Sequence, residues 1–203
     1  MVNLTRLVLL RHGRTEWNHT DRMQGQHDVH LDDVGIEQAH AAARTLGKRD
    51  FLAVYSSDLA RARVTAETVA KDLDLPVVVD PRLQEIHMGS WSGKTRAEVE
   101  AEFPDFARLY WEGKDFRRSP EGETIAEMVE RAMPALREII QRHEGHDVLV
   151  VGHGFMLSQI AQHLVGIRAE SRILGGLSNA HWTELGIAAD GNAWIIGHNV
   201  APQ

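Results

Sequence analysis

Two short apolar runs constrain this 203-residue chain more than any other feature, because each run ends at a histidine. Residues 7–10 are followed by Arg11-His12-Gly13, and residues 148–151 are followed by Gly152-His153-Gly154. Continuous apolar runs of this length predict strands that are buried on both faces. Open α/β folds place their ligand chemistry where such strands end. We therefore expect an α/β fold in which both histidines reach one crevice.

A third strand end adds a cation to this crevice. The segment 55–62 is a short apolar stretch followed by a polar loop and Arg61. Histidine is a nitrogen nucleophile near neutral pH, a guanidinium fork matches phosphate oxygens, and Gly13 lets the backbone approach a ligand. Two guanidinium groups beside His12 would lower its pKa and keep the attacking imidazole neutral. The pattern indicates phosphoryl transfer through histidine; the alternative is a strand end with a solvated arginine and histidine.

The rest of the chain alternates between helical and extended patterns. Helices are predicted over residues 33–46, 59–73, 123–142 and 155–164, and strands over residues 51–55, 77–79, 180–185 and 193–197. Ile36 is expected on the buried face of the first helix, and Val64 and Thr68 on that of the second. Pro134 is expected to kink the third helix or to divide it. Residues 89–120 show the least regular pattern, and their aromatic side chains suggest a packed cap.

Composition excludes several other classes of protein. The formal net charge of -7 argues against nonspecific binding of nucleic acid, and no apolar run is long enough to cross a membrane. The first residues lack the pattern of a signal peptide, and the chain has no cysteine, which together favour a cytoplasmic protein. The histidines at positions 19, 27, 30 and 40 lack a zinc-binding spacing, so no metal is expected.

Four motifs, taken together, resemble one known family. They are Arg11-His12-Gly13 with Thr15 and Trp17-Asn18, then Ser57-Asp58-Leu59 with Arg61-Ala62, then Leu83-Gln84-Glu85 with Gly89 and Gly93, and finally Gly152-His153-Gly154. In this order and at this spacing, the chain resembles the histidine phosphatase superfamily in its phosphoglycerate-mutase-like branch, from the first strand to about Trp194. The resemblance implies one domain over residues 1–203, a three-layer α/β sandwich with a mostly parallel sheet, and a small cap-like insertion around residues 89–120.

The resemblance also implies roles for individual residues. His12 would carry the phosphoryl group as phosphohistidine, and His153 would donate a hydrogen bond to that group. Glu85 would be the general acid for the leaving oxygen and then the base for water. Arg11 and Arg61 would hold the phosphoryl oxygens. The expected substrate-binding residues are Arg11, Arg14, Asn18, Gln24, Gly25, Arg61 and Gly154. No metal and no cofactor is expected.

Within this family, the choice lies between a phosphatase and a mutase. The span from Glu85 to Glu123 is short compared with that of the mutases, and residues 121–124 resemble a signature of the phosphatases. Arg117-Arg118, in contrast, is similar to a substrate-binding pair of the mutases. Residues 22–26 and 174–183 are similar to segments of the actinobacterial glucosyl-3-phosphoglycerate phosphatases, a subgroup whose members tend to pair into homodimers.

We therefore expect a phosphatase that acts on a small phosphorylated metabolite, either glucosyl-3-phosphoglycerate, a phosphoglycerate-like compound or a broader set of phosphomonoesters. A phosphoglycerate mutase is the first alternative, and a noncatalytic phospho-ligand binder on the same fold is the second. The intact positions His12, Glu85 and His153, with both arginines, argue against the binder.

Overall fold

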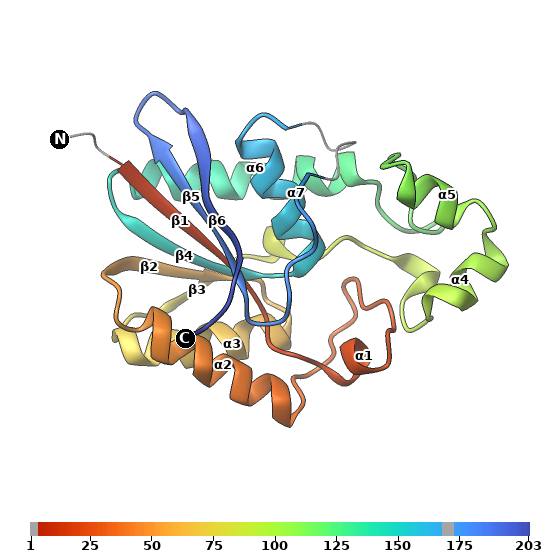
Figure 1. The fold of residues 1–203 in the computed structure, drawn as a ribbon, viewed down its shortest axis with the longest axis horizontal. Helices are drawn as coiled ribbons and strands as arrows, with labels where there is room; N and C mark the ends of the chain where they lie inside the picture. The colour runs from red at the N-terminus through yellow and green to blue at the C-terminus, as the bar shows by residue number, and fades with distance from the viewer. Residues whose placement is uncertain (1–3, 168–172) are drawn as a thin grey trace.

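The computed structural model describes residues 4–167 and 173–203, and its centre is a six-stranded sheet in the order β3-β2-β4-β1-β5-β6 (Figure 1). The strands are β1 (Leu4–Arg11), β2 (Phe51–Ser56), β3 (Val77–Val79), β4 (Asp147–Gly152), β5 (Trp182–Ala188) and β6 (Ala193–Val200). The helices are α1 (Glu16–His19), α2 (Asp33–Leu46), α3 (Ala60–Leu73), α4 (Arg96–Glu102), α5 (Phe106–Trp111), α6 (Ile125–Arg142) and α7 (Gly154–Leu164). Two 3-10 turns, η1 (Pro81–Leu83) and η2 (Gly89–Trp91), lie between β3 and α4.

Most of the sheet is parallel. Strand β1 pairs with β4 in parallel, and β2 pairs in parallel with both β4 and β3. Strand β5 is antiparallel to β1 and forms a hairpin with β6. Figure 1 shows α2 and α3 on one face of the sheet and α6 and α7 on the other. The expectation of a three-layer α/β fold with a mostly parallel sheet is therefore confirmed.

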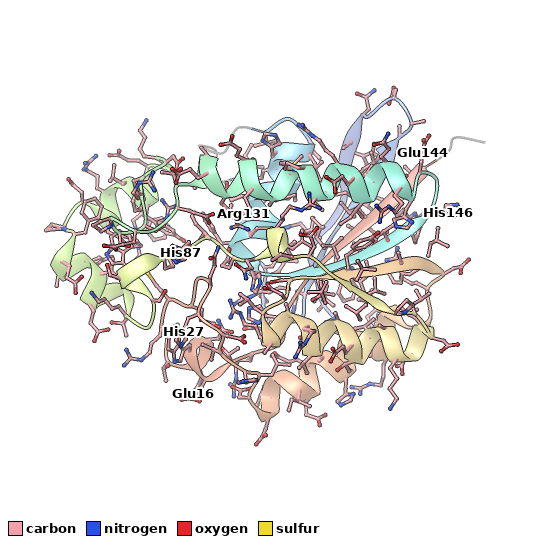
Figure 2. The ribbon with its side chains drawn as sticks, turned by 180° about the vertical axis from the view of Figure 1, so that it is seen from behind. Glu16, His27, His87, Arg131, Glu144 and His146 are labelled. Atoms are coloured by element: carbon pink, nitrogen blue, oxygen red, sulfur yellow. The ribbon has the colours of Figure 1, made fainter. Side chains whose placement is uncertain are left out.

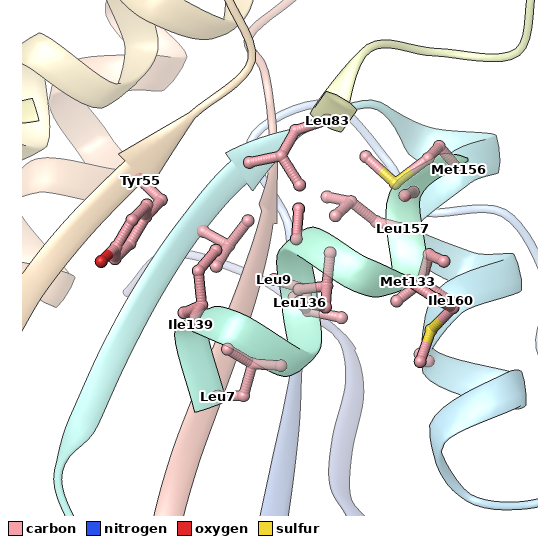
Figure 3. Packing of buried hydrophobic residues seen from close by; sticks show 14 of the residues in the cluster. Leu7, Leu9, Tyr55, Leu83, Met133, Leu136, Ile139, Met156, Leu157 and Ile160 are labelled. Carbon is pink, nitrogen blue, oxygen red and sulfur yellow. The ribbon is translucent and has the colours of Figure 1, made fainter. Parts of the chain in front are cut away.

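Alternate residues of β1 enter two separate hydrophobic cores. Leu7 and Leu9 pack with Leu136 of α6 and with residues of α7 (Figure 3). Val8 and Leu10 pack on the opposite face, with residues of α2 and α3. Because successive side chains of a strand point to opposite faces, a strand covered by helices on both sides must be apolar at each covered position. This requirement explains the unbroken apolar run 7–10.

The buried faces of α2 and α3 differ from two expectations. Ile36 is 41% exposed, because Gly35 is the residue of this turn that packs against the neighbouring loop. In α3, Val64 and Thr68 are only half-buried, while Ala62 and Ala66 face the sheet. The predicted orientation of both helices was therefore wrong at these positions. Small side chains let α3 approach the sheet closely, which the spacing of larger apolar residues did not reveal.

Helix α6 begins later than predicted and is not divided. Its N-cap is Thr124, which forms a capping box with Glu127, so the helix begins at Ile125 instead of Glu123. The helix then continues through Pro134 to Arg142, so of the two predicted alternatives, a kink or a division, the division does not occur. Pro134 lies on the exposed face, where water can hydrogen-bond the carbonyl that lacks a helical partner.

The hairpin at the end of the chain is shifted relative to the prediction. Strand β5 begins at Trp182 and not at residue 180, because Ala180 has a left-handed backbone with φ 56°. The Ala180 N–H donates to the carbonyls of Arg11 and His12, at 3.2 and 3.1 Å. The turn before β5 is thus fixed to the end of β1, and the hairpin extends to Val200.

The segment from η2 to residue 116 contains two short helices, although its sequence looked irregular. Helices α4 and α5 lie beyond the end of the sheet at which β1 ends (Figure 1). Trp91, Val99 and Phe106 form a third, smaller hydrophobic cluster there, with Phe103 and Phe116 packed against it. The expected packing of the aromatic side chains is confirmed for Trp91, Phe103, Phe106 and Tyr110, whereas Trp111 is 65% exposed.

Gly13, in the loop after β1, and Gly35, in the first turn of α2, form a close backbone contact. A Cβ on Gly13 would lie 2.2 Å from the Gly35 carbonyl oxygen, and a Cβ on Gly35 would lie 1.9 Å from the Arg14 carbonyl oxygen. Gly13 therefore allows the close approach of Gly35, a reason for glycine at this position that the sequence did not suggest. This contact fixes the loop that carries His12 against the first turn of α2.

Replacing Gly35 by Ala should therefore destabilise the protein, although the same change in an open helix is stabilising by about 1 kcal/mol. We expect a loss of about 1–3 kcal/mol in the free energy of unfolding, because the added methyl group has no space. Urea denaturation measures it. Gly176→Ala is the control, since a Cβ there meets nothing within 4 Å. Equal stability of the two variants would contradict this account.

Candidate active site

The parallel pairing of β1 with β4 brings the two motif histidines together. Arg11 is in register with Gly152, and the His12 N–H donates to the Gly152 carbonyl at 3.0 Å. The imidazole rings of His12 and His153 lie 5.3 Å apart between centroids, and they are 3% and 0% exposed. The expectation that both strand ends reach one crevice is thus met by the geometry.

The proton of His12 has a defined place. Its Nδ1 lies 2.6 Å from the Gly13 carbonyl oxygen, which can only accept a hydrogen bond, so Nδ1 carries the proton. Burial, followed by the charges of Arg61 and Arg11, lowers the pKa of His12 well below its ordinary value. The ring is therefore neutral at physiological pH, and Nε2 keeps a lone pair with which it can attack an electrophile.

Arg61 is fixed beside the histidines by the loop before α2. Its Nη1 and Nη2 donate to the carbonyls of His27 and Gly25, each at 2.7 Å, and the residue is almost fully buried. The positive φ of Gly25, +52°, turns that carbonyl toward the guanidinium. Arg61 Nε has no hydrogen-bond partner in the described part of the chain. Burial lowers the pKa of Arg61 to about 10, so the side chain stays charged at neutral pH.

Arg11 approaches the same place from the end of β1. Its Nη1 donates to the Leu177 carbonyl at 2.5 Å, while its buried Nε has no partner among the described residues. A Cβ on Gly154 would lie 3.0 Å from Arg11 Cδ and Nε, so only glycine permits this position of the side chain. Two guanidinium groups with buried, unused Nε donors therefore stand beside the histidine pair, as a phosphoryl group requires.

Glu85 is held against the first turn of α7. Its Oε1 accepts hydrogen bonds from the N–H groups of Ile86 and Met156, at 2.9 and 2.8 Å, and its Oε2 accepts one from Phe155 at 3.1 Å. Its charge raises the pKa values of Arg11 and Arg61, which shows that the carboxylate lies close to both cations. These three hydrogen bonds fix the position of the carboxyl group beside the two arginines.

The remaining predicted substrate-binding residues are placed differently from one another. Asn18 Oδ1 accepts hydrogen bonds from Thr15 and Asn179. The amide nitrogen of Asn18 is not used in these contacts and remains available as a donor. Gln24 is buried, and its Oε1 has no partner in the described chain. Arg14 instead pairs with Asp32, with its Nε 2.8 Å from Oδ2. The structure thus does not bring Arg14 into the group around His12.

Two residues that organise the site were missed in the sequence. Asn179 Nδ2 donates to the His12 carbonyl and to Asn18 Oδ1, at 3.2 and 3.1 Å. Arg131 of α6 reaches toward the segment before His87 (Figure 2) and donates to the Gln84 and Glu85 carbonyls, each at 3.1 Å. The sequence singles out the segment 174–183, but no pattern in it indicates a role for Asn179. Arg131 borders the apolar stripe of its helix, which was the one available signal.

The guanidinium of Arg131 is itself fixed by Glu123. Arg131 Nε and Nη2 donate to the two carboxylate oxygens of Glu123, at 2.8 and 2.9 Å, and Glu123 Oε2 also accepts from the His87 N–H. The carboxylate and guanidinium together hold both ends of the segment that carries Glu85. Among the described residues, no group of three or more histidine, aspartate or glutamate side chains is arranged to hold a metal ion.

Comparisons with known proteins agree with this geometry. The model of the histidine phosphatase superfamily (branch 1) matches residues 7–199. A glucosyl-3-phosphoglycerate phosphatase from Mycolicibacterium vanbaalenii is 41% identical over 91% of this chain and 85% of its own length. A metal-independent phosphoserine phosphatase from Arabidopsis thaliana is 38% identical over 87% of this chain and 75% of its own. A Yersinia pestis protein named "Probable phosphoglycerate mutase GpmB" is 33% identical over 83% of this chain and 78% of its own.

The solved structure of a mycobacterial glucosyl-3-phosphoglycerate phosphatase in complex with VO3 superposes with a TM-score of 0.90. It is 36% identical and covers 97% of this chain and 99% of its own. The chain therefore belongs to the histidine phosphatase superfamily, and the prediction of a phosphatase of this family is confirmed. Within the described residues, no helix is both long and apolar enough to cross a membrane.

The buried histidines predict a pH dependence of stability. Burial and nearby arginines lower the pKa of both His12 and His153 well below 6.5, the value expected in the unfolded chain. Below about pH 6.5 the unfolded state therefore binds more protons than the folded state, and the free energy of unfolding falls as the pH falls, by about 1.4 kcal/mol per pH unit for each histidine.

Denaturation between pH 8 and pH 5 measures this slope. His12→Gln should make it shallower, whatever its effect on stability at pH 8. The exposed His19→Gln is the matched control and should leave the slope unchanged. The assignment fails if wild type and His12→Gln have the same slope.

Proposed function

We propose that the chain hydrolyses phosphomonoesters through a phosphohistidine at His12. The observation that carries this proposal is the position of His12 Nε2, a lone-pair nitrogen on a buried neutral ring beside Arg11 and Arg61. The unused Nε donors of both arginines supply hydrogen bonds and positive charge to three transferring phosphoryl oxygens. A noncatalytic binder would need the cations but not a nucleophile with its proton held on the opposite nitrogen.

In the first step, His12 Nε2 attacks phosphorus and the bond from phosphorus to the ester oxygen breaks. Glu85 gives its proton to the leaving oxygen, and the organic product departs as an alcohol. Three backbone N–H groups hold the Glu85 carboxyl group in place for this transfer. His153 donates a hydrogen bond to the transferring group.

In the second step, a water molecule attacks phosphorus and the bond from phosphorus to His12 breaks. Glu85 accepts the proton of that water, which releases inorganic phosphate and restores the protonated acid. A mutase must exclude water from this stage and return the phosphoryl group to an acceptor. The phosphatase is favoured, because the relatives named as phosphatases are 38–41% identical to the chain, while relatives named as probable phosphoglycerate mutases are 33% identical.

The organic part of the substrate has a cavity beside Glu85. A cavity of about 480 Å³ lies between α5 and α7, and its walls include Phe116, Arg118, Phe155 and Gln159. Phe155 connects this cavity to the reacting groups, because its N–H donates to Glu85 Oε2. The leaving oxygen, which takes its proton from Glu85, would therefore lead the rest of the substrate into this space. We propose that residues 89–120 act as a cap that forms its outer wall.

Arg118 indicates that the substrate carries a second anionic group. Its side chain is buried, with the guanidinium 4.0 Å from the centre of the Phe116 ring and 5.7 Å from that of Phe155. Burial lowers the pKa of Arg118 to about 10, and the carboxylate of Asp115 is 3.8 Å away. A carboxylate of the substrate would pair with this guanidinium. Relatives named glucosyl-3-phosphoglycerate phosphatase support a phosphorylated glycerate-like metabolite with a bulky substituent.

The compartment and the assembly are also proposals. The absence of cysteine and the net charge of -7 fit a cytoplasmic enzyme. Trp194 and Ile196 project from the edge strand β6 and are 44% and 47% exposed, which fits a homodimer that covers them.

The reaction itself is tested by its products. Incubated with 3-phosphoglycerate or a sugar phosphate in excess chelator, the protein should release inorganic phosphate without a bisphosphoglycerate primer, because imidazole and guanidinium groups supply the chemistry. His12→Ala should abolish release and leave no acid-labile phosphoenzyme. Primer-dependent interconversion of 2- and 3-phosphoglycerate that is faster than phosphate release would reverse the choice in favour of the mutase.

The assignment of Arg118 is tested with two substrates. Arg118→Met should raise KM for a phosphoglycerate about ten- to a hundred-fold, as expected when a charged hydrogen bond of about 1.5–3 kcal/mol is lost. It should leave KM for p-nitrophenyl phosphate, which has no carboxylate, within about two-fold. The control is Arg117→Met, since Arg117 is 48% exposed and pairs with Glu127. Equal effects of Arg118→Met on both substrates would contradict a carboxylate subsite.

A further inference from the structure

Ser57 lies directly after β2 and contacts the second histidine of the site. Its Oγ is 2.9 Å from His153 Nε2, and both residues are 0% exposed. The Ser57 N–H donates to the Val151 carbonyl of β4 at 3.1 Å, which fixes the serine beside the strand that ends at His153. The other ring nitrogen, His153 Nδ1, is buried and has no partner in the described part of the chain.

This pair leaves two places for the single proton of a neutral His153. In one arrangement, Nε2 carries the proton and donates to Ser57 Oγ. The serine O–H then needs another acceptor, and the described residues offer none for it, while the lone pair of Nδ1 remains unused in a site built for anions. In the other arrangement, the Ser57 O–H donates to Nε2, and Nδ1 carries the proton. Every polar hydrogen of the pair except Nδ1–H then has its acceptor.

A second contact favours the latter arrangement. The Leu59 N–H points at Ser57 Oγ from 3.4 Å, so the serine oxygen already faces one donor. Burial and the charges of Arg61, His12 and Arg11 lower the pKa of His153 well below its ordinary value, which keeps the ring neutral and its proton count at one. The unsatisfied Nδ1–H is then the one donor of the ring that a ligand can use.

We propose that Ser57 is a positioning residue that holds His153 as the Nδ1–H tautomer, so that this N–H is available to the transferring phosphoryl group. The two histidines then have complementary roles set by one neighbour each. The Gly13 carbonyl places the proton of His12 on Nδ1 and frees Nε2 for attack, whereas the Ser57 hydroxyl occupies Nε2 of His153 and makes its Nδ1 a donor. The inference rests on the proposed role of His153 as a hydrogen-bond donor.

The tautomer is measured directly by two-bond ¹H–¹⁵N NMR on protein labelled with ¹⁵N-histidine, with the His153 signals assigned from their absence in His153→Gln. In the wild type we expect the pattern of an Nδ1–H imidazole. In Ser57→Ala we expect the Nε2–H form or a mixture of both. Ser56→Ala is the control, because Ser56 is equally buried and its hydroxyl donates to the Ser57 carbonyl instead of touching His153. If Ser57→Ala does not fold, Ser57→Cys gives a weaker donor of similar shape.

Activity provides the second readout. Ser57→Ala should lower kcat about ten- to a hundred-fold with little change in KM, because the lost donor acts in the transition state. An Nε2–H pattern in the wild type, or an Nδ1–H pattern that survives loss of the Ser57 hydroxyl, would overturn the inference. A changed tautomer with unchanged kcat would instead overturn the proposed role of His153 and leave the Ser57 contact standing. The NMR result needs no turnover, so the two failures are distinguishable.

Discussion

The parallel pairing of β1 with β4 is the interaction on which the site depends. It places Arg11 opposite Gly152 and joins the His12 N–H to the Gly152 carbonyl. His12 and His153 therefore follow the ends of two neighbouring strands at the same edge of the sheet. A slip of one residue would send each side chain of β1 to the other face and exchange the two cores. The hydrophobic pattern of residues 7–10 therefore fixes the register, and the register fixes the distance between the two rings.

Burial of positive charge is the second constraint. Arg11 and Arg61 are desolvated and stand beside two neutral imidazoles, an arrangement that is unfavourable without an anion. Glu85 and the carbonyls of Gly25, His27 and Leu177 compensate the charges in part. The Nε donors of both arginines remain without partners among the described residues, and in the proposed reaction they bind the phosphoryl group.

Segments distant in the sequence hold the reacting groups in place. Asn179 fixes the His12 carbonyl from the turn before β5, and Arg131 fixes the Glu85 segment from α6 with the help of Glu123. Among the described residues, no hydrogen bond joins Asn179 to the Glu85 segment or Arg131 to the His12 loop, so the proposed nucleophile and the proposed acid are positioned by separate contacts. Losing either contact would disturb one role while leaving the other intact.

The sequence by itself determined an α/β fold and the strands whose ends carry His12, Arg61 and His153, because apolar runs must be covered on both faces and motif residues follow the ends of strands. The three layers and the choice of Glu85 came from the resemblance of four motifs to a known family. The tertiary structure alone decided the exposure of Ile36, the pairing of Arg14 with Asp32, and the real reason for Gly13, which is the approach of Gly35. It also revealed the contacts that Ser57, Asn179 and Arg131 make with His153, His12 and Glu85. Such roles depend on contacts between residues 46 to 167 positions apart, and no local pattern records which distant group a side chain will meet.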